Sequence, residues 1–464
     1  MKSGIKKGLN SYPTVQFPSD FVWGAATSSF QIEGAVAKDG RIPSIWDQFC
    51  TQPGAISDGT DGEVACDHYL RMTDDVELMS KLNLQAYRFS IAWPRIVSTT
   101  AKHNDQGLDF YDRLVDQLLA RNIRPYVTLY HWDLPQWIQE KGGWVNRDTV
   151  SYFTDFTSAV VKRLGDRVSD WITHNEPWCA AILGYAKGEH APGLKSWNDA
   201  LIASHHILLS HGLSMPIIRE LSPGCEAGIA LNMSPVHANR EINYDQSQAR
   251  IIDGEMNRWF GDPVFLGSYP EDMVEHYDKL DYFGTEQPMS FVKPGDMEAI
   301  STPTDFLGIN YYSRILAADE SKAEPQKRQP SNVTDMGWEV YPKGIYEITN
   351  YAKKRWGVDK IYITENGAAY PDEPNGDQQV HDSRRVSYFQ SHIESLGNAC
   401  RDSIPIAGYF AWSLMDNFEW AFGYSKRFGI VWVDYETQQR IPKDSALWYR
   451  DMIAQFLEEQ GGSK

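Results

Sequence analysis

Two glutamates end apolar, strand-like runs of the sequence. Glu176 lies in the stretch WITHNEPW, immediately before Pro177. Proline cannot continue the hydrogen-bond ladder of a strand, and it biases the residue before it toward an extended conformation. We therefore expect Glu176 to lie where a strand gives way to a loop. Glu365 ends a second such run, IYITENG.

Two carboxyl groups that face each other could cleave a glycosidic bond. One protonates the departing oxygen, while the other attacks the anomeric carbon or directs water onto it. The acid needs its pKa raised from about 4.3 toward 6, which an apolar wall and a like-charged neighbour achieve. Trp171, Trp178 and Cys179 are candidates for that wall. The other carboxylate must stay ionised, and Arg88 and Tyr312 could supply the opposite charge and the hydrogen bond that favour this state.

The elements that position these residues alternate along the chain. Eight β-rich runs bounded by turn signals begin at positions 21, 86, 124, 168, 227, 305, 361 and 406. Stretches with helical apolar spacing begin at positions 73, 107, 149, 344, 383 and 445. In the first of them Val76, Met79 and Leu82 recur at the spacing of a helix packed on a sheet. Alternating strands and helices imply a parallel sheet, because each crossover returns the chain to the same end.

Eight such units predict an α/β fold, a single (β/α)8 TIM barrel. Long connections from about 233 to 303 and from 313 to 342 contain no Gly/Ser-rich linker, so we interpret them as βα-loop insertions. The sequence thus predicts one catalytic domain over residues 1–464, with a core at about 17–455. The alternative, a doubly wound open sheet, would need a glycine-rich phosphate turn after its first strand. The stretch WGAATSSFQIEG has no GxGxxG there, which favours the barrel.

The carboxyl ends of the strands form the catalytic face of such a barrel. The fourth run ends at Glu176 and the seventh at Glu365, so the two can face each other across the mouth. Each polar residue at these ends, taken alone, is more often a solvated rim residue or an ion-pair partner. Their shared location predicts a site, and its candidates are Gln31, Arg88, Trp93, His131, Trp132, Asp133, Asn175, Glu176, Asn310, Tyr311, Tyr312, Glu365, Asn366, Trp412, Asp416, Glu419 and Trp420.

Composition narrows the classes of ligand. The chain has 13% aromatic residues with 16 Trp, and indole faces suit flat, hydroxyl-bearing ligands such as sugars. A net charge of −18 repels phosphate backbones and anionic membranes, so we expect no nucleic-acid partner. No run reaches 18 uninterrupted apolar residues, and the start of the sequence has no apolar segment of signal-peptide length. We therefore expect no membrane span.

Cysteine and histidine usage predicts neither a disulfide framework nor a metal site. Five cysteines, an odd number without a CxxC pair, fit reduced thiols in a cytoplasmic protein. His205, His206 and His211 lie on a predicted helix, but no acid or thiol stands nearby at ligand spacing. We expect these histidines on the helix surface or in packing, and we expect no metal or organic cofactor.

The motifs THNEP, from Thr173 to Pro177, and YITENG, from Tyr362 to Gly367, resemble the acid/base and nucleophile motifs of glycoside hydrolase family 1. The resemblance extends over FVWGAATSSFQIEGA, YRFSIAWPRI, LYHWDLPQW, LGINYYS and GYFAWSLMDNFEWAFGYSKRFGIVWVDY. It covers nearly the whole chain, about residues 17 to 455. It implies the barrel already expected and retaining hydrolysis of β-glycosides without a cofactor, with carboxyl groups roughly 5 to 5.5 Å apart.

The resemblance also implies roles for individual residues. Glu176 is the implied acid/base and Glu365 the implied nucleophile, which Tyr312 and Arg88 would orient and tune. Asn175 would bind the sugar 2-hydroxyl. The further implied sugar contacts are Gln31, His131, Glu419 and Trp420 at other hydroxyls, Trp412 on the ring face, and Trp338 at the aglycone entrance. Trp132, beside His131 at the same strand end, is a further substrate-binding candidate.

Departures from related patterns indicate the substrate subclass. Relatives that cleave 6-phosphoglycosides typically have Ser where Glu419 stands, because a carboxylate there would repel the phosphate. Thioglucosidase relatives replace the acid with Gln, whereas Glu176 is present here. The resemblance thus implies a β-glucosidase acting on terminal β-D-glucosyl residues of cello-oligosaccharides or aryl and alkyl glucosides, with galactosides or fucosides tolerated. A small-molecule β-glycoside is the expected partner.

Three alternatives stay open at this point. The first is a 6-phospho-β-glycosidase. The second is a sugar-binding barrel without turnover, which two like charges flanking a bond disfavour. The third is transglycosylation, in which an acceptor replaces water. The sequence does not set the aglycone preference or the oligomeric state.

Overall fold

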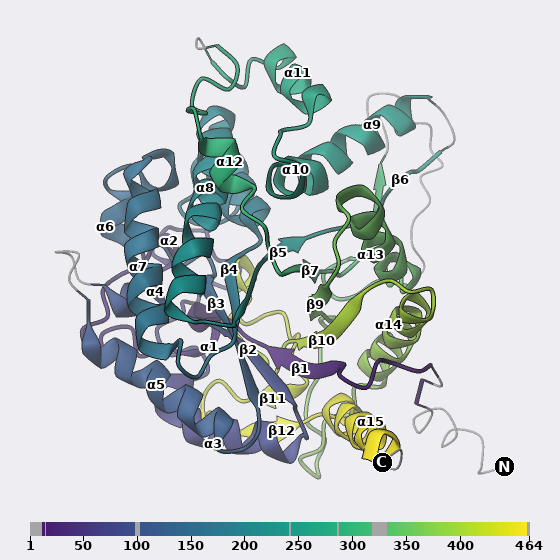
Figure 1. The fold of residues 1–464 in the computed structure, drawn as a ribbon. Coiled ribbons are helices and arrows are strands. Elements are labelled where there is room, and N and C mark those ends of the chain that lie inside the picture. Colours follow the sequence, from purple (N-terminus) through teal and green to yellow (C-terminus); the bar gives the residue numbers. More distant parts are fainter. Residues whose placement is uncertain are drawn as a thin grey trace.

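Eight parallel strands close into a barrel in the computed structural model, which describes residues 12–13, 15–97, 103–240, 243–284, 287–317 and 332–461. Figure 1 shows the strands surrounded by helices. The strands follow one another around the barrel in the order β1, β10, β9, β7, β5, β4, β3, β2. Their bounds are β1 Val22–Ala26, β2 Ala86–Ser90, β3 Arg124–Tyr130, β4 Asp170–Asn175, β5 Glu226–Asn232, β7 Phe306–Asn310, β9 Ile361–Asn366 and β10 Ile406–Trp412. The closed parallel barrel confirms the predicted fold and is incompatible with an open doubly wound sheet.

One outer helix follows each barrel strand and packs against its neighbours, as Figure 1 shows. These helices are α3 His68–Lys81, α5 Asp105–Leu119, α7 Asp148–Leu164, α8 Trp197–Leu221, α10 Trp259–Leu266, α13 Lys343–Trp356, α14 Ser383–Arg401 and α15 Asp444–Gly461. Six of them coincide with the stretches that showed an apolar stripe. Two, α8 and α10, do not.

Helix α8 is long and apolar enough to cross a membrane by length and composition, but 78% of its most apolar window is buried inside the protein. A helix buried on most sides has no polar face to contrast with its apolar one, which explains the absence of a clear stripe. The histidines predicted on this helix are buried, and His205 bonds Asp296 at 2.9 Å, so they pack rather than lie on the surface.

The interior of the barrel is filled by aromatic side chains from β3, β7, β9 and β10. Tyr126 contacts Tyr362 and Phe410, with ring centroids 5.4 and 4.8 Å apart, and Phe306 contacts Tyr362 at 5.1 Å. Alanines on neighbouring strands leave room for these rings. The barrel is therefore a packed core that closes the floor of the catalytic face.

Shorter elements fill the connections. Before β5 lie α1 Ser29–Ile32, α2 Ile45–Cys50, α4 Trp93–Ile96, α6 Gln136–Gln139, η1 Gly143–Val145 and η2 Cys179–Lys187. Between β5 and β9 lie β6 Val236–Ala238, α9 Asn243–Asp253, η3 Gly254–Arg258, α11 Glu271–Lys279, α12 Asp296–Ile300 and β8 Ile315–Ala317, and after β10 lie η5 Trp420–Phe422, β11 Val431–Val433 and β12 Arg440–Pro442. Strand β6 pairs in parallel with β8, which joins the two predicted insertions. The first insertion also supplies the outer helix α10, and part of the second, 318–331, lies outside the described residues.

Candidate active site

Irregular pairing marks the strands that bear the two glutamates. The β4–β5 register jumps between Ile172 and Asn175, directly before Glu176. The β7–β9 register jumps between Ile309 and Asn310, where Asn310 stands opposite Glu365. Bulges of this kind occur beside active sites, where they change the direction of a side chain. Both glutamates thus lie at the carboxyl ends of their strands, as expected.

The backbone of Glu176 departs from the usual preference of a residue before proline. The residue lies at the strand end before Pro177, but its φ is +47°, in the left-handed region and not extended. The Glu176 N–H donates to the Ala230 carbonyl at 2.8 Å, and the Glu176 carbonyl accepts from the Ala180 N–H at 3.2 Å. A non-glycine residue in this region costs on the order of 1–3 kcal/mol, so the surrounding structure must hold it there. The long-range bond to β5 outweighs the local preference before proline.

The two carboxyl groups have different partners. Glu365 accepts hydrogen bonds from the Arg88 guanidinium at 2.7 Å and from the Tyr312 hydroxyl at 2.6 Å. Glu176 accepts at Oε1 from the Asn310 amide at 2.7 Å, and its Oε2 accepts from the Cys179 thiol at 3.0 Å. Arg88 is therefore the only cationic side chain, among the described residues, that directly contacts either carboxyl group, and it contacts Glu365.

A network of amides fixes these partners. The Thr364 hydroxyl donates to Asn310 Oδ1 at 2.6 Å, which turns the Asn310 amide nitrogen toward Glu176. Asn175 Oδ1 accepts from Arg88 at 2.6 Å and from Asn310 at 2.9 Å. The Asn175 amide nitrogen then donates to His131 Nε2 at 3.0 Å. One chain of hydrogen bonds thus links both carboxyl groups to a residue of the pocket wall.

Burial and the second carboxylate raise the pKa of Glu176 to about 7. Burial also raises the pKa of Glu365, and the Arg88 guanidinium and the Tyr312 hydroxyl act in the opposite direction. The proton that the pair holds near neutral pH therefore belongs on Glu176. This is the unequal protonation that general acid catalysis beside an ionised carboxylate requires.

A pocket of about 690 Å³ contains both carboxyl groups. Its lining includes ten of the residues proposed for the site: His131, Trp132, Glu176, Asn310, Tyr312, Trp338, Glu365, Trp412, Glu419 and Trp420. Gln31, Asn175 and Arg88 are fully buried just behind this wall and reach it through hydrogen bonds. Gln31 lies on helix α1 and not on the first strand, which ends at Ala26.

Aromatic rings form one side of the pocket. The rings of Trp132 and Trp420 lie 4.5 Å apart, and the His131 ring lies 5.9 Å from that of Trp412. Trp132 and Trp420 both have positive φ, 76° and 49°, so the backbone at two pocket positions is strained in addition to that at Glu176. Trp338 is 36% exposed and contacts Tyr312 at the edge of the pocket. These flat faces match the shape of a pyranose ring.

Glu419 is a third acid in the pocket. Burial, together with the charges of Glu365 and Glu176, raises the pKa of Glu419 to about 8. Gln31 donates to Glu419 at 3.4 Å and to Asn417 at 2.9 Å. Glu419 can therefore bind adjacent hydroxyls of a sugar as both donor and acceptor below that pH.

Gly367, in the ENG motif, allows two strand ends to meet. A Cβ at this position would lie 1.7 Å from the carbonyl oxygen of Trp412. Only glycine permits this approach of the chain after β9 to the end of β10. The motif thus brings the chain just after Glu365 against the backbone of Trp412, and both residues line the pocket.

Five other residues predicted at the strand ends lie outside the pocket lining. Trp93 stacks on Phe156 in the core, Tyr311 donates to the Tyr341 carbonyl, and Asn366 donates to the Tyr311 carbonyl and to Tyr388. Asp133 accepts from Ser29, and Asp416 pairs with Lys443 and Arg427. Trp171 also lies outside the acid's wall, because its side chain points to Ser222 on the helix side of β4. These side chains support the site or the fold and do not line the pocket.

Asn310 and Cys179 donate hydrogen bonds to Glu176, a role that the sequence did not predict for either residue. The sequence predicts Asn310 only as a strand-end residue and Cys179 only as part of an apolar wall. The signal for Cys179 was its spacing, because a helix that begins after Pro177 brings the residue three positions after Glu176 back toward its side chain. Trp178, Leu183, Met256, Met336, Phe422 and Phe428 also line the pocket.

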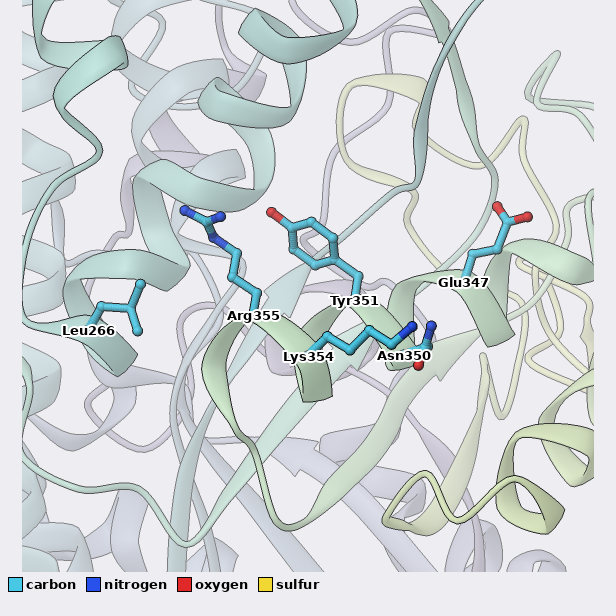
Figure 2. Close-up of a pocket in the computed structure, with 6 residues that line it drawn as sticks. All are labelled: Leu266, Glu347, Asn350, Tyr351, Lys354 and Arg355. Atoms are coloured by element: carbon cyan, nitrogen blue, oxygen red, sulfur yellow. The ribbon is translucent and has the colours of Figure 1, made fainter.

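A second hollow, of about 490 Å³, lies on the outer surface between α10 and α13 (Figure 2). Figure 2 shows Leu266 on one side and side chains of α13 on the other. Arg355 there is paired with Asp262, and the only carboxylate in the lining is Glu347. In the described residues no group of three or more His, Cys, Asp or Glu could hold a metal ion. The pocket at the barrel mouth, and not this outer hollow, therefore contains the two facing carboxyl groups.

A closed parallel barrel with two unequal carboxyl groups in an aromatic pocket at its strand ends defines a glycoside hydrolase. The model of glycosyl hydrolase family 1 matches residues 14–456, and the chain belongs to this family.

Three relatives place the chain within the family. It is 43% identical over 446 residues to β-glucosidase A of Acetivibrio thermocellus, covering 95% of this chain and 98% of the relative. It is 42% identical over 467 residues to a bifunctional β-D-glucosidase/β-D-fucosidase of Bifidobacterium breve, covering 95% and 99%. The solved structure of a Thermotoga maritima β-glucosidase in complex with glucoimidazole has a TM-score of 0.90 at 43% identity, covering 95% and 99%.

Proposed function

We propose that the protein is a retaining β-glucosidase in which Glu365 is the nucleophile and Glu176 the acid/base. The observation that supports this assignment is the difference between the two sets of partners. A cation and a hydroxyl donor favour the ionised form of Glu365, and burial favours the protonated form of Glu176. The opposite assignment would require Glu365 to be protonated although the Arg88 guanidinium, 2.7 Å away, favours its ionised form.

In the first step Glu365 attacks the anomeric carbon while Glu176 protonates the leaving oxygen. The covalent glycosyl-enzyme forms, the aglycone leaves, and Glu176 becomes ionised. In the second step Glu176 takes a proton from water, which attacks the anomeric carbon and releases Glu365. An alcohol that takes the place of this water gives a new glycoside, so transglycosylation is part of the proposal.

The sugar subsite favours an unphosphorylated hexose. Asn175, which bonds Arg88 and Asn310 next to the two carboxyl groups, would bind the 2-hydroxyl, and His131, Gln31, Glu419 and Trp420 would bind the others. The pocket has no free cation in its described lining to receive a phosphate, because Arg314 is held by Glu339 at 2.7 and 2.9 Å. The names of the relatives support β-D-glucosides as substrates, with β-D-fucosides tolerated.

The exposed ring of Trp338 at the pocket edge supports a leaving-group subsite there, where it would contact aryl aglycones or the next sugar of a cello-oligosaccharide.

All five cysteines are free thiols, which supports a reducing, cytoplasmic location.

A chromogenic aryl β-D-glucoside and its 6-phosphate counterpart test the proposal directly. We expect hydrolysis of the plain glucoside, at least about 100-fold lower kcat/KM on the phosphorylated one, and no turnover by Glu365→Gln. Faster cleavage of the phosphorylated substrate would replace the proposed substrate class with 6-phosphoglycosides. Binding of glucoside without turnover would make the protein a sugar-binding barrel.

A further inference from the structure

The side chain of Cys179 contacts the proposed acid. Cys179 begins η2, three residues after Glu176, and its Sγ lies 3.0 Å from Glu176 Oε2. It is 7% exposed and lines the pocket. The other oxygen of Glu176, Oε1, accepts from the Asn310 amide at 2.7 Å. Each carboxyl oxygen of Glu176 thus has one side-chain partner of its own.

These two partners differ in what they can do. The Asn310 amide nitrogen can only donate, so Oε1 is an acceptor in both protonation states of Glu176. The catalytic proton must therefore be on Oε2, beside the sulfur. A thiol is a weak donor through S–H and a weak acceptor through its lone pairs. Burial, followed by the charge of Glu176, raises the pKa of the Cys179 thiol well above its ordinary value, so the sulfur keeps its proton.

We propose that Cys179 is a positioning residue that assigns the catalytic proton to Oε2 of Glu176 and accommodates both protonation states of that carboxyl group. The proposal depends on the acid/base role proposed for Glu176. When Glu176 is ionised, the S–H donates to Oε2. When Glu176 is protonated, the S–H rotates away and the sulfur accepts from the carboxyl O–H.

The weakness of the thiol as a donor is the property that matters. A serine hydroxyl at this position would donate strongly to the carboxylate and favour the ionised form, which weakens the acid. An alanine would leave Oε2 without a donor in a buried site and favour the protonated form, which weakens the base. The thiol favours neither form of Glu176 as strongly as serine or alanine would. This balance matters because Glu176 must act as an acid and then as a base in one catalytic cycle.

Other charged or titratable groups also face Glu176 and set the background against which Cys179 acts. They are Glu365 from β9, Arg88 from β2, Tyr312 after β7 and Glu419 after β10. None of them is altered by a change at position 179, so variants there isolate the contribution of the thiol.

The test compares the pH dependence of kcat/KM for Cys179→Ala, Cys179→Ser and the unchanged enzyme on an aryl β-glucoside with a poor leaving group. The alkaline limb reports the loss of the proton from Glu176, and the acidic limb reports Glu365. We expect the alkaline limb to move up in C179A and down in C179S, each by about half a pH unit or more. The acidic limb should stay in place in both.

Cys400→Ala is the matched control, because Cys400 lies on α14 away from the pocket lining, and this variant should keep both limbs. Unmoved alkaline limbs in C179A and C179S, with unchanged melting temperatures, would overturn the proposal, and so would shifts in the same direction. Glu176→Gln separates this result from failure of the proposed function. If the alkaline limb persists in E176Q, the limb belongs to another group and the role of Glu176 itself is wrong.

Discussion

The Arg88 guanidinium donates a hydrogen bond to Glu365 at 2.7 Å, and both side chains are almost fully buried. A cation this close stabilises the ionised carboxylate, and an apolar side chain in its place would raise the pKa of Glu365. Because the nucleophile must be ionised, the acidic limb of the kcat/KM profile of Arg88→Met should move to higher pH. We also expect kcat/KM at neutral pH to fall on the order of 100-fold, since Asn175 loses a donor as well.

Arg71→Met is the control for this prediction. Arg71 pairs with Asp67 on the exposed face of α3, where its side chain is 40% exposed. The acidic limb of the kcat/KM profile of Arg71→Met should match that of the unchanged enzyme. An acidic limb that also stays in place in R88M would show that Arg88 does not tune the nucleophile.

Proton donation by Glu176 should depend on the leaving group. Glu176→Gln keeps the shape of the side chain but removes the acid, which contributes on the order of 10² to 10⁴ in rate. The first step should therefore slow most for glucosides with poor, basic leaving groups and least for activated aryl glucosides. Single-turnover kinetics on a series of aryl β-glucosides measures this dependence. Equal losses across the series would exclude Glu176 from this role.

Gly367 should tolerate no side chain. In Gly367→Ala the new methyl group would meet the Trp412 carbonyl, so the chain after β9 must shift. We expect a loss of about 1–3 kcal/mol in the free energy of unfolding and a lower kcat, because Glu365 moves with this chain. Gly376→Ala is the control, since its Cβ would meet nothing within 4 Å, and its stability should be unchanged or rise by up to about 1 kcal/mol. Equal behaviour of the two variants in urea denaturation would contradict the close approach.

A buried ion network supports the chain after β10. The Lys443 ammonium bonds Asp372 at 2.8 Å and Asp416 at 2.9 Å, and Lys443 and Asp416 are 0% exposed. Lys443→Met removes one of two cations from each carboxylate, because Asp372 keeps Arg385 and Asp416 keeps Arg427. We expect a loss of about 1.5–3 kcal/mol in the free energy of unfolding. Lys81→Met removes the exposed pair with Glu77 and should cost less than about 0.5 kcal/mol. A K443M protein as stable as K81M would remove the network from the account of stability.

The sequence was sufficient to predict the barrel and the strand ends that bear Glu176 and Glu365, because the spacing of apolar residues and the positions of turn residues are local features. It was not sufficient to predict features that depend on contacts between residues far apart in the chain. The backbone of Glu176 is left-handed, against the local preference before proline, and its N–H bonds the distant Ala230 carbonyl. Helix α8 showed no apolar stripe because it is buried on most sides, and Asp416 was mistaken for a pocket residue because its partner Lys443 lies far along the chain.

The stereochemistry of the first product tests the central claim most directly. Retention requires that Glu365 form a covalent intermediate before Glu176 activates water, with the carboxyl groups roughly 5 to 5.5 Å apart. Proton NMR of an aryl β-D-glucoside during hydrolysis, recorded before the released sugar mutarotates, identifies the first anomer. The account predicts β-D-glucose, and α-D-glucose appearing first would contradict it.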